Sequence, residues 1–267
     1  MKKHIIYIIS VLLLFSSCSQ YQKLLKSDDY ELKYKKAQEF HAKGDFMRAI
    51  TLLEAVQPQY RGTTEAANIV FLLADSHFNN RDYETAISYY TSYIKNFPYG
   101  ENAIECRYMI GYGYYKLSPD PKLDQNDTHK GIAAFETFLD MHSYSERASE
   151  AVRLKNELEE KLAFKELLNA RLYFRLGNFQ GNNYQSAIIV SRNLLNRYPE
   201  TKYREDFAFL ILRSKFTEAQ RSVASKRADR FRSTLEEGEM FLNEFPNGRH
   251  RRDAEKILAD TRRQLEN

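Results

Sequence analysis

The sequence YIKNFP at residues 93–98 recurs along this chain as LLNRYP at residues 194–199 and as FLNEFP at residues 241–246. A fourth copy, FLDMHS at residues 138–143, lacks the proline. An aromatic residue followed by proline is typical of the end of a helix, because proline cannot continue one. A helix-ending sequence that returns several times indicates a repeat architecture.

A second recurring sequence indicates that each repeat is a pair of helices. GDFMRAI at residues 44–50 matches RDYETAI at 81–87 and NYQSAI at 183–188, and HKGI at 129–132 is a degenerate copy. Each copy places an aromatic residue three positions before a small one, except the degenerate copy, which keeps only the small residue. A small residue near the start of a second helix lets the partner helix approach closely, so the pattern predicts tight helix–turn–helix units.

The rest of the chain supports an all-α prediction. No stretch alternates apolar and polar residues as a strand would, and the 6 prolines and 10 glycines lie mainly at expected helix ends. We predict about five helical pairs and a closing helix with one apolar stripe, as a terminal cap requires. The pairs lie near residues 30–61, 67–99, 103–143, 150–199 and 203–246, and the closing helix lies near 249–265.

Two departures from the regular repeat are expected. A leucine at about every fourth position predicts one long helix from about residue 146 to residue 176. Composition predicts loops at residues 118–130 and 177–183, which are rich in proline, glycine, aspartate and asparagine.

The N-terminal sequence has the features of an export signal. Lys2 and Lys3 precede an apolar run at residues 5–15, which is too short to span a bilayer, and Cys18 follows two serines. This order predicts a lipoprotein signal at residues 1–17, with Cys18 as the lipidated N-terminus. The alternatives are an ordinary signal cut elsewhere and an uncleaved anchor. Residues 18–28 would be a tether, and residues 29–267 one solenoid domain.

The charge distribution argues against one class of protein, and the position of the second cysteine indicates its environment. The formal net charge is +4, and the two signs are interspersed, which argues against a nucleic-acid binder. The second of the 2 cysteines, Cys106, lies among apolar residues, so we expect a buried and unreactive thiol.

Neither a metal site nor a catalytic site is expected. Asp124, Asn126 and Thr128 alternate like the first ligands of a calcium loop, but His129 replaces the required glycine and Phe135 replaces the final glutamate. We instead expect Asp127 or Thr128 to cap the next helix. The six histidines have no metal-ligand spacing, and His41 and His77 are expected as packing residues. No phosphate loop, nucleophile elbow or dinucleotide fingerprint occurs, so we predict no cofactor and no enzymatic activity.

Two groups of residues are candidates for binding a protein partner. Four tyrosines between residues 108 and 115 cover too wide an arc to face one core, so some could line a groove. The candidates are Tyr108, Tyr112 and Tyr115. A basic run near the C-terminus is either a solvated helix start or a docking site for an acidic surface. Its arginines are Arg249, Arg251 and Arg252.

The repeats resemble the tetratricopeptide repeat, a helix–turn–helix of about 34 residues. The match is best in the second pair, at Leu73, Ala74, Tyr83, Ala86, Tyr90, Tyr93 and Pro98. Together with the cysteine-ended signal, the chain resembles the BamD family of outer-membrane protein assembly lipoproteins. Three stretches carry that resemblance. The first is residues 123–128 leading into 133–139, the second is residues 162–163, 170–173 and 194–201, and the third is FPYG at 97–100 with its copies.

This resemblance implies a non-catalytic, lipid-anchored protein on the periplasmic face of the outer membrane. Family members bind the periplasmic domains of the BamA insertase through their C-terminal repeats, and their N-terminal repeats are thought to receive unfolded barrel precursors. The alternative is a repeat lipoprotein that organises other envelope or cell-wall machinery.

Overall fold

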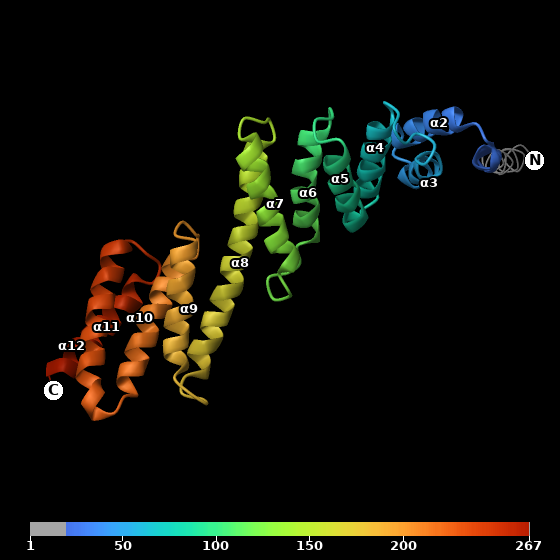
Figure 1. Ribbon diagram of the computed structural model, residues 1–267. Helices are drawn as coiled ribbons and strands as arrows, with labels where there is room; N and C mark the ends of the chain where they lie inside the picture. Colours follow the sequence, from blue (N-terminus) through green and yellow to red (C-terminus); the bar gives the residue numbers. More distant parts are fainter. Residues whose placement is uncertain (1–19, 267) are drawn as a thin grey trace, which may run out of the picture. The chain divides into compact units, whose positions relative to one another are not determined.

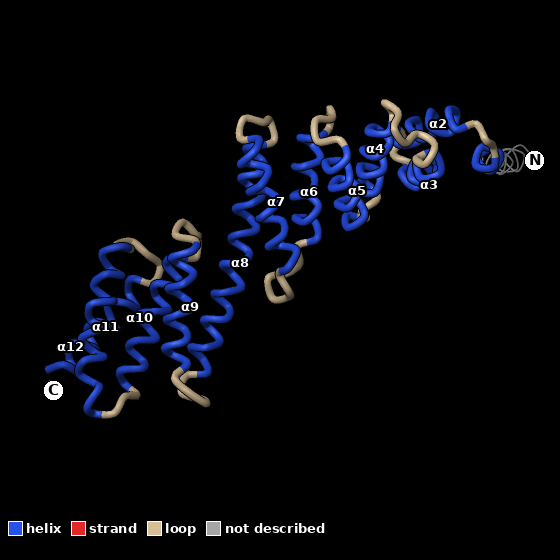
Figure 2. The backbone as a smooth tube through the Cα atoms, in the orientation of Figure 1, coloured by secondary structure: helices blue, strands red, loops and turns tan. Residues whose placement is uncertain are grey.

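A computed structural model describes residues 20–266, in which helix is the only regular secondary structure (Figures 1 and 2). Residues 20–26 are helical. The helices that follow are α2 (Tyr30–Ala42), α3 (Phe46–Val56), α4 (Ala66–Asn79), α5 (Tyr83–Asn96), α6 (Ala103–Leu117), α7 (Asn126–His142), α8 (Ala148–Leu176), α9 (Asn183–Arg197), α10 (Arg204–Gln220), α11 (Ala224–Glu244) and α12 (Arg251–Glu266). The predicted signal and Cys18 lie outside the described residues.

The helices confirm the predicted all-α repeat architecture. α2 to α11 form five successive pairs at the predicted positions, and α12 follows as the closing helix. The predicted long helix is α8, which has 29 residues. Within the described residues, no helix combines the length and hydropathy that crossing a membrane requires.

The described chain divides into two compact units, and the single solenoid domain at residues 29–267 stays a prediction. Unit 1 contains the residues up to Ser118 and Asn126–Lys155, and unit 2 contains Pro119–Gln125 and the residues from Asn156 onward. The short segment Pro119–Gln125 belongs to unit 2 because it lies against α8: Lys165 Nζ donates to the Leu123 carbonyl at 2.6 Å.

The recurring aromatic residue ends the second helix of a pair in the same way each time. Phe97, Tyr198 and Phe245 have φ between −133° and −121°, outside the helical region. Each N–H donates to the carbonyl four residues earlier, and each carbonyl accepts from the N–H three residues later. The following proline enforces this exit, because it disfavours helical geometry in the residue before it.

The fourth copy keeps the turn without the proline. The His142 carbonyl accepts from Ser145 N at 3.0 Å, and Ala148 N donates to the Ser145 carbonyl at 2.9 Å. The imidazole packs on Phe138, and burial lowers the pKa of His142, so the neutral ring serves as an aromatic packing group. A related turn, which the sequence did not reveal, follows α3: the carbonyl of Tyr60, four residues after Val56, accepts from Thr63 N at 3.1 Å.

The turns inside the pairs are built from the second recurring sequence. Asp45 and Asp82 cap α3 and α5 by accepting from the N–H three residues later. The preceding residues, Gly44 and Arg81, have φ of 77° and 65°. Glycine adopts this left-handed conformation readily, whereas arginine there is strained. The cap of α9 is Asn182, one residue before Asn183, which aligns with Asp45 and Asp82 in the recurring sequence.

Small residues and aromatic rings make up the core, as the pattern predicted. Ala49, Ala86 and Ala187 are fully buried where the second helices meet their partners. Three glycines mark close helix crossings: a Cβ on Gly113 would lie 2.6 Å from Ile87, one on Gly111 would lie 2.7 Å from the Phe135 ring, and one on Gly238 would lie 2.7 Å from Leu258. The core depends on these positions having no side chain.

One loop prediction was wrong at its C-terminal end. The loop predicted at 118–130 ends earlier, because α7 begins at Asn126, so Asp127 and Thr128 lie inside the helix and do not cap it. The Thr128 hydroxyl is instead 2.7 Å from the Ser118 hydroxyl, and Thr128 is buried. That bond between the two ends of the loop lets the helix start sooner than composition indicates.

Candidate partner-binding groove

Unit 2 contains a half-open groove of about 440 Å³ between α8, α10 and the start of α12. Three exposed arginines line it: Arg171 and Arg175 from α8, and Arg213 from α10. Its floor is apolar and consists of Leu168, Phe174, Phe209 and Leu210. Residues 171 and 175 are four apart and so project from the same face of α8.

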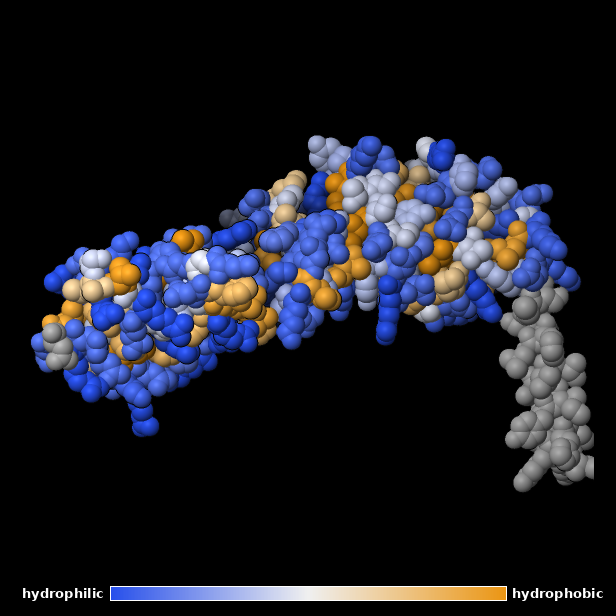
Figure 3. Space-filling model, turned by 90° about the horizontal axis from the view of Figure 1, so that it is seen from below, coloured by the Kyte–Doolittle hydropathy of each residue, from blue (hydrophilic) through white to orange (hydrophobic). Residues whose placement is uncertain are grey.

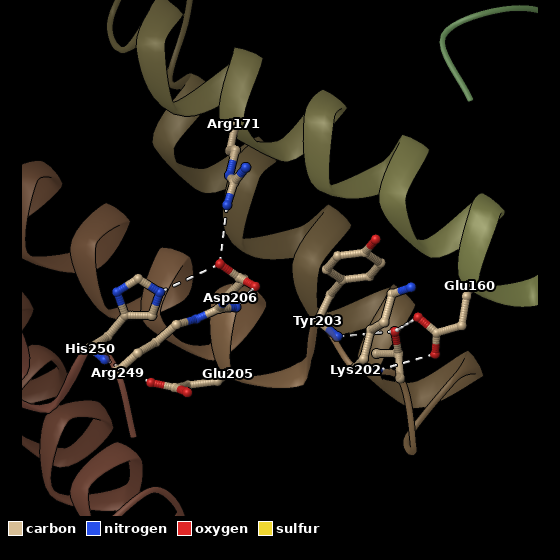
Figure 4. Close-up of polar contacts among 9 residues, drawn as sticks. Glu160, Arg171, Lys202, Tyr203, Glu205, Asp206, Arg249 and His250 are labelled. Carbon is tan, nitrogen blue, oxygen red and sulfur yellow. Dashed lines mark hydrogen bonds and ion pairs between the residues drawn. The ribbon is translucent and has the colours of Figure 1, made fainter. Parts of the chain in front are cut away.

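Asp206 organises the basic side of the groove, as Figure 4 shows. Its carboxylate is 8% exposed, and Oδ1 accepts from Arg171 Nη2 at 3.1 Å. Arg249 contacts the other carboxylate oxygen, and His250 Nε2 lies 3.4 Å from Oδ1. A buried carboxylate is stable only with such partners, so Asp206 fixes side chains from α8 and from the turn before α12.

Aromatic rings hold the remaining basic groups in place. The His250 ring stacks on Phe209 with centroids 4.4 Å apart and an interplanar angle of 5°, and its backbone N–H donates to Glu205 Oε1 at 2.8 Å. The Arg213 guanidinium lies 4.7 Å from the Phe174 ring centroid and 5.7 Å from that of Phe209. Cation–π contact orients Arg213 without neutralising it.

The groove differs in charge from a second basic cluster in unit 2. In that cluster Glu237 pairs with Arg192 at 3.0 Å and with Lys215 at 2.6 Å, and Glu218 pairs with Arg230 at 2.9 Å. Those cations already have carboxylate partners. By contrast, Arg175 and Arg213 form no ion pair with any residue in the described range, 20–266, and Asp206 is the only acidic residue lining the groove.

A separate polar contact, also drawn in Figure 4, fixes the turn that leads into α10. Glu160 on α8 accepts from the Thr201 hydroxyl at 3.0 Å and from Lys202 N at 3.1 Å. It thereby holds the residues just before Asp206 against α8. Glu160 thus holds the residues that precede α10, and Asp206 holds its first turn, so both carboxylates position α10 relative to α8.

The structure gives different positions to the three predicted arginines. Arg249 contacts Asp206 beside the groove. Arg251 contacts Glu255 at 2.8 Å, and Arg252 is exposed on the first turn of α12. A role in partner binding stays a prediction for all three. Sequence reasoning missed Arg171, Arg175 and Arg213, because they lie on different helices and only the fold brings them together.

The predicted tyrosines form an aromatic row in unit 1. Tyr112 stacks on Tyr108, Tyr115 and Phe78, with centroids 5.3 to 6.1 Å apart. Tyr108 is only 2% exposed and packs on Phe135 and Phe138, so its ring has no surface left for a partner. Tyr112 and Tyr115 are half-buried, and their partner binding stays a prediction.

The histidines named as packing residues have that environment. His77 is buried against the Tyr89 ring at 5.4 Å, with Nδ1 2.9 Å from an Asp82 oxygen. His41 Nε2 lies 2.7 Å from Asp75. Among residues 20–266, no cluster of three or more histidine, cysteine, aspartate or glutamate side chains is arranged to hold a metal ion.

One face of the molecule has several hydrophobic areas. The hydrophobic residues visible in Figure 3 are separated into patches by hydrophilic ones. The groove itself combines an aromatic floor with Arg175 and Arg213, which form no ion pair within residues 20–266.

Comparison with known proteins assigns the chain to a family. Residues 27–212 match the model of the family described as outer membrane lipoprotein (YfiO). The chain belongs to this family. The predicted resemblance to BamD proteins is thereby confirmed.

Two curated relatives share that assignment. The putative outer membrane protein assembly factor BamD of Aquifex aeolicus is 25% identical over 210 residues, which are 77% of this chain and 65% of the relative. The outer membrane protein assembly factor BamD of Caulobacter vibrioides is 22% identical over 231 residues, 86% of this chain and 70% of the relative. The chain thus spans about two thirds of the length of these relatives.

Among solved structures, the TPR2AB-domain:pHSP90-complex of yeast Sti1 is similar, with a TM-score of 0.41 and 16% identity. The similarity covers 87% of this chain and 98% of that chain.

Cys106 provides a test of the core around α6. It is free and fully buried, and burial raises the pKa of its thiol to about 12. At pH 8 the thiolate is therefore scarce in the folded chain, whereas an exposed cysteine has a pKa of about 8.5. We expect iodoacetamide to alkylate Cys106 at least ~100-fold more slowly in the native protein than in urea, as measured by peptide mass spectrometry. Equal rates in the two conditions would contradict the burial.

Proposed function

We propose that this chain is a non-catalytic lipoprotein scaffold of the outer-membrane β-barrel assembly machinery. The observation that carries the proposal is the family match over residues 27–212, which runs through both units. The names of the two relatives, both outer membrane protein assembly factors, point to the same role. In this role the chain binds the periplasmic domains of a BamA-type insertase and presents unfolded barrel precursors for insertion.

The architecture suits binding rather than catalysis. Paired helices bury one face against the next pair and leave the other available along the stack. Such a surface can hold an extended polypeptide without folding it. The polar clusters of unit 2 serve as ion pairs between helices, as the contacts of Asp206, Glu218 and Glu237 illustrate. The proposed activity is therefore recognition alone.

We also propose that a lipid on Cys18 holds the chain at the periplasmic face of the outer membrane. The sequence Lys2-Lys3, the apolar run at residues 5–15 and the following Ser-Ser-Cys support this anchor. The family description, outer membrane lipoprotein, agrees with it. A lipoprotein carries several acyl chains, which are enough for stable anchoring.

A repeat lipoprotein that organises other envelope machinery remains the alternative. It would share the anchor and the helical pairs and differ in the partner that it retains. Binding to the insertase therefore separates the two functions.

The mature chain, immobilised through a C-terminal tag, should retain the purified periplasmic domains of the insertase from the same organism. Replacing Arg251 and Arg252 with glutamate should reduce retention about ten-fold if the basic run docks an acidic surface. Lys43→Glu with Lys95→Glu, which reverses two exposed charges in unit 1, is the matched control and should have no effect.

Retention of the insertase domains and the role of the basic run can each be contradicted without the other. Lack of retention by the unmodified chain, with capture of a different envelope complex, would overturn the assembly role. Full retention by the Arg251 and Arg252 variant would remove only the basic run from the interface.

Cells that express the full chain should incorporate labelled palmitate into it, and the Cys18→Ala variant should not. The reason is that the cysteine sulfur is the acylation site of a lipoprotein signal. Labelling that persists in the variant would refute the anchor at this position.

A further inference from the structure

The groove between α8 and α10 is built to receive an anion beside an apolar group. Arg175 and Arg213 line it without ion pairs in the described part of the chain, and the floor beneath them contains Phe174 and Phe209. Such paired features are found at protein-binding sites, where arginine and aromatic residues contribute most of the affinity.

The charge balance at the groove favours an acidic occupant. Arg171, Arg175 and Arg213 line it, and Asp206 supplies the one negative charge of its lining. Two positive charges are left after Asp206 is paired. An acidic group would neutralise part of this excess positive charge, and the low polarity of the floor would strengthen the attraction between that group and the arginines.

The positions of the arginines are set before any partner arrives. Asp206 holds Arg171 from one side, and the aromatic floor holds Arg213 from below. Fixing long side chains in advance lowers the entropy that a partner must overcome on binding. Each guanidinium still has N–H donors directed to solvent, since one carboxylate cannot use all five.

The shape of the groove favours a polypeptide over a small anion. Free phosphate would use the arginines and leave the partly exposed side chains of Leu168 and Phe174 in contact with water. A volume of about 440 Å³ accommodates more than a simple ion, and the open top lets a chain enter and leave. A lipid would need a longer apolar channel for its acyl chains than two aromatic rings and two leucines provide.

We infer that this groove binds an extended acidic segment of a partner polypeptide. A carboxylate of that segment lies between Arg175 and Arg213, and a neighbouring large apolar side chain covers the partly exposed Leu168 and Phe174. The inference goes beyond the proposed function, because it names a surface and the chemistry of its occupant and holds for any machinery that the chain serves.

Fluorescence anisotropy of labelled peptides tests this inference with the mature chain. The probe is a 12-residue Gly/Ser peptide with Asp-Phe-Asp at its centre, and the comparison peptides carry Asn-Phe-Asn or Asp-Ala-Asp. We expect the first peptide to bind at least ten-fold more tightly than either of the others, and its affinity to fall as salt is raised.

Charge reversal at the groove should abolish the preference. Arg175→Glu with Arg213→Glu should weaken binding of the Asp-Phe-Asp peptide at least ten-fold and should favour a Lys-Phe-Lys peptide. Lys226→Glu with Lys256→Glu makes the same change in net charge on exposed positions of α11 and α12 outside the groove. This control should bind within two-fold of the unmodified chain.

Photocrosslinking keeps the test decisive if the double variant fails to fold. A peptide with benzoylphenylalanine in place of its phenylalanine should crosslink to residues 168–175 or 206–213 of the unmodified chain. Crosslinks confined to other segments would overturn the inference, as would equal affinity for the acidic and amide peptides.

Three other occupants would each replace the proposed one. Binding to phosphatidylglycerol vesicles that is lost in the groove variant, with no binding of the acidic peptide, would assign the groove to lipid. Inorganic phosphate that displaces the peptide at equal concentration would assign it to a small anion. Concentration-dependent dimers that only the groove variant fails to form would assign it to a second copy of this chain.

Discussion

The half-buried aromatic residue in the turn at or just beyond the end of each second helix is the constraint on which the rest of the structure depends. At Phe97, Tyr198 and Phe245 the backbone leaves the helix while the N–H still bonds to the last turn. The backbone carbonyl of the aromatic residue then accepts a hydrogen bond from the N–H three residues later. The carbonyl of that later residue accepts from the N–H of the first residue of the next helix. The direction of every following pair is thus set by a short hydrogen-bonded turn.

Ring packing explains why this position is aromatic. Phe97 packs on Tyr93, His142 on Phe138 and Phe245 on Phe241, with centroids 5.1 to 5.7 Å apart. The inner ring of each pair is buried in the core, and the outer ring covers it at the turn. Aromatic pairs at this separation add to the free energy of burial, so a turn with a small residue there would be less firmly placed.

The sequence was enough to predict most of the fold, because each helical pair is specified by local signals. Proline after an aromatic residue, aspartate before a helix and alanine at a crossing each act within a few residues. The missed turn at Tyr60 lacks a proline on its C-terminal side. The early start of α7 depends on the Ser118–Thr128 contact across a loop, which no local pattern contains.

The groove was not predictable from the sequence for the same physical reason. Its arginines are ordinary solvated residues when each helix is considered alone, and Asp206 is one acidic residue in a first turn. Only the stacking of α8, α10 and the start of α12 places residues 171, 206 and 250 together. Of the residues predicted to bind a partner, Arg249 lies at one edge of this site, and Tyr108 is buried in the core.

Native-state hydrogen exchange measures the central constraint most directly. In five of the turns, a backbone amide donates to the backbone carbonyl of the aromatic residue or of His142. The account predicts that these five amides exchange at least ~10-fold more slowly than amides of an unstructured chain. These belong to Thr63, Gly100, Ser145, Thr201 and Gly248. The amides of Tyr99 and Tyr144, whose side chains are fully exposed in the same turns, should exchange near the unstructured rate. Fast exchange at all five donor amides, with the helices still protected, would contradict the account.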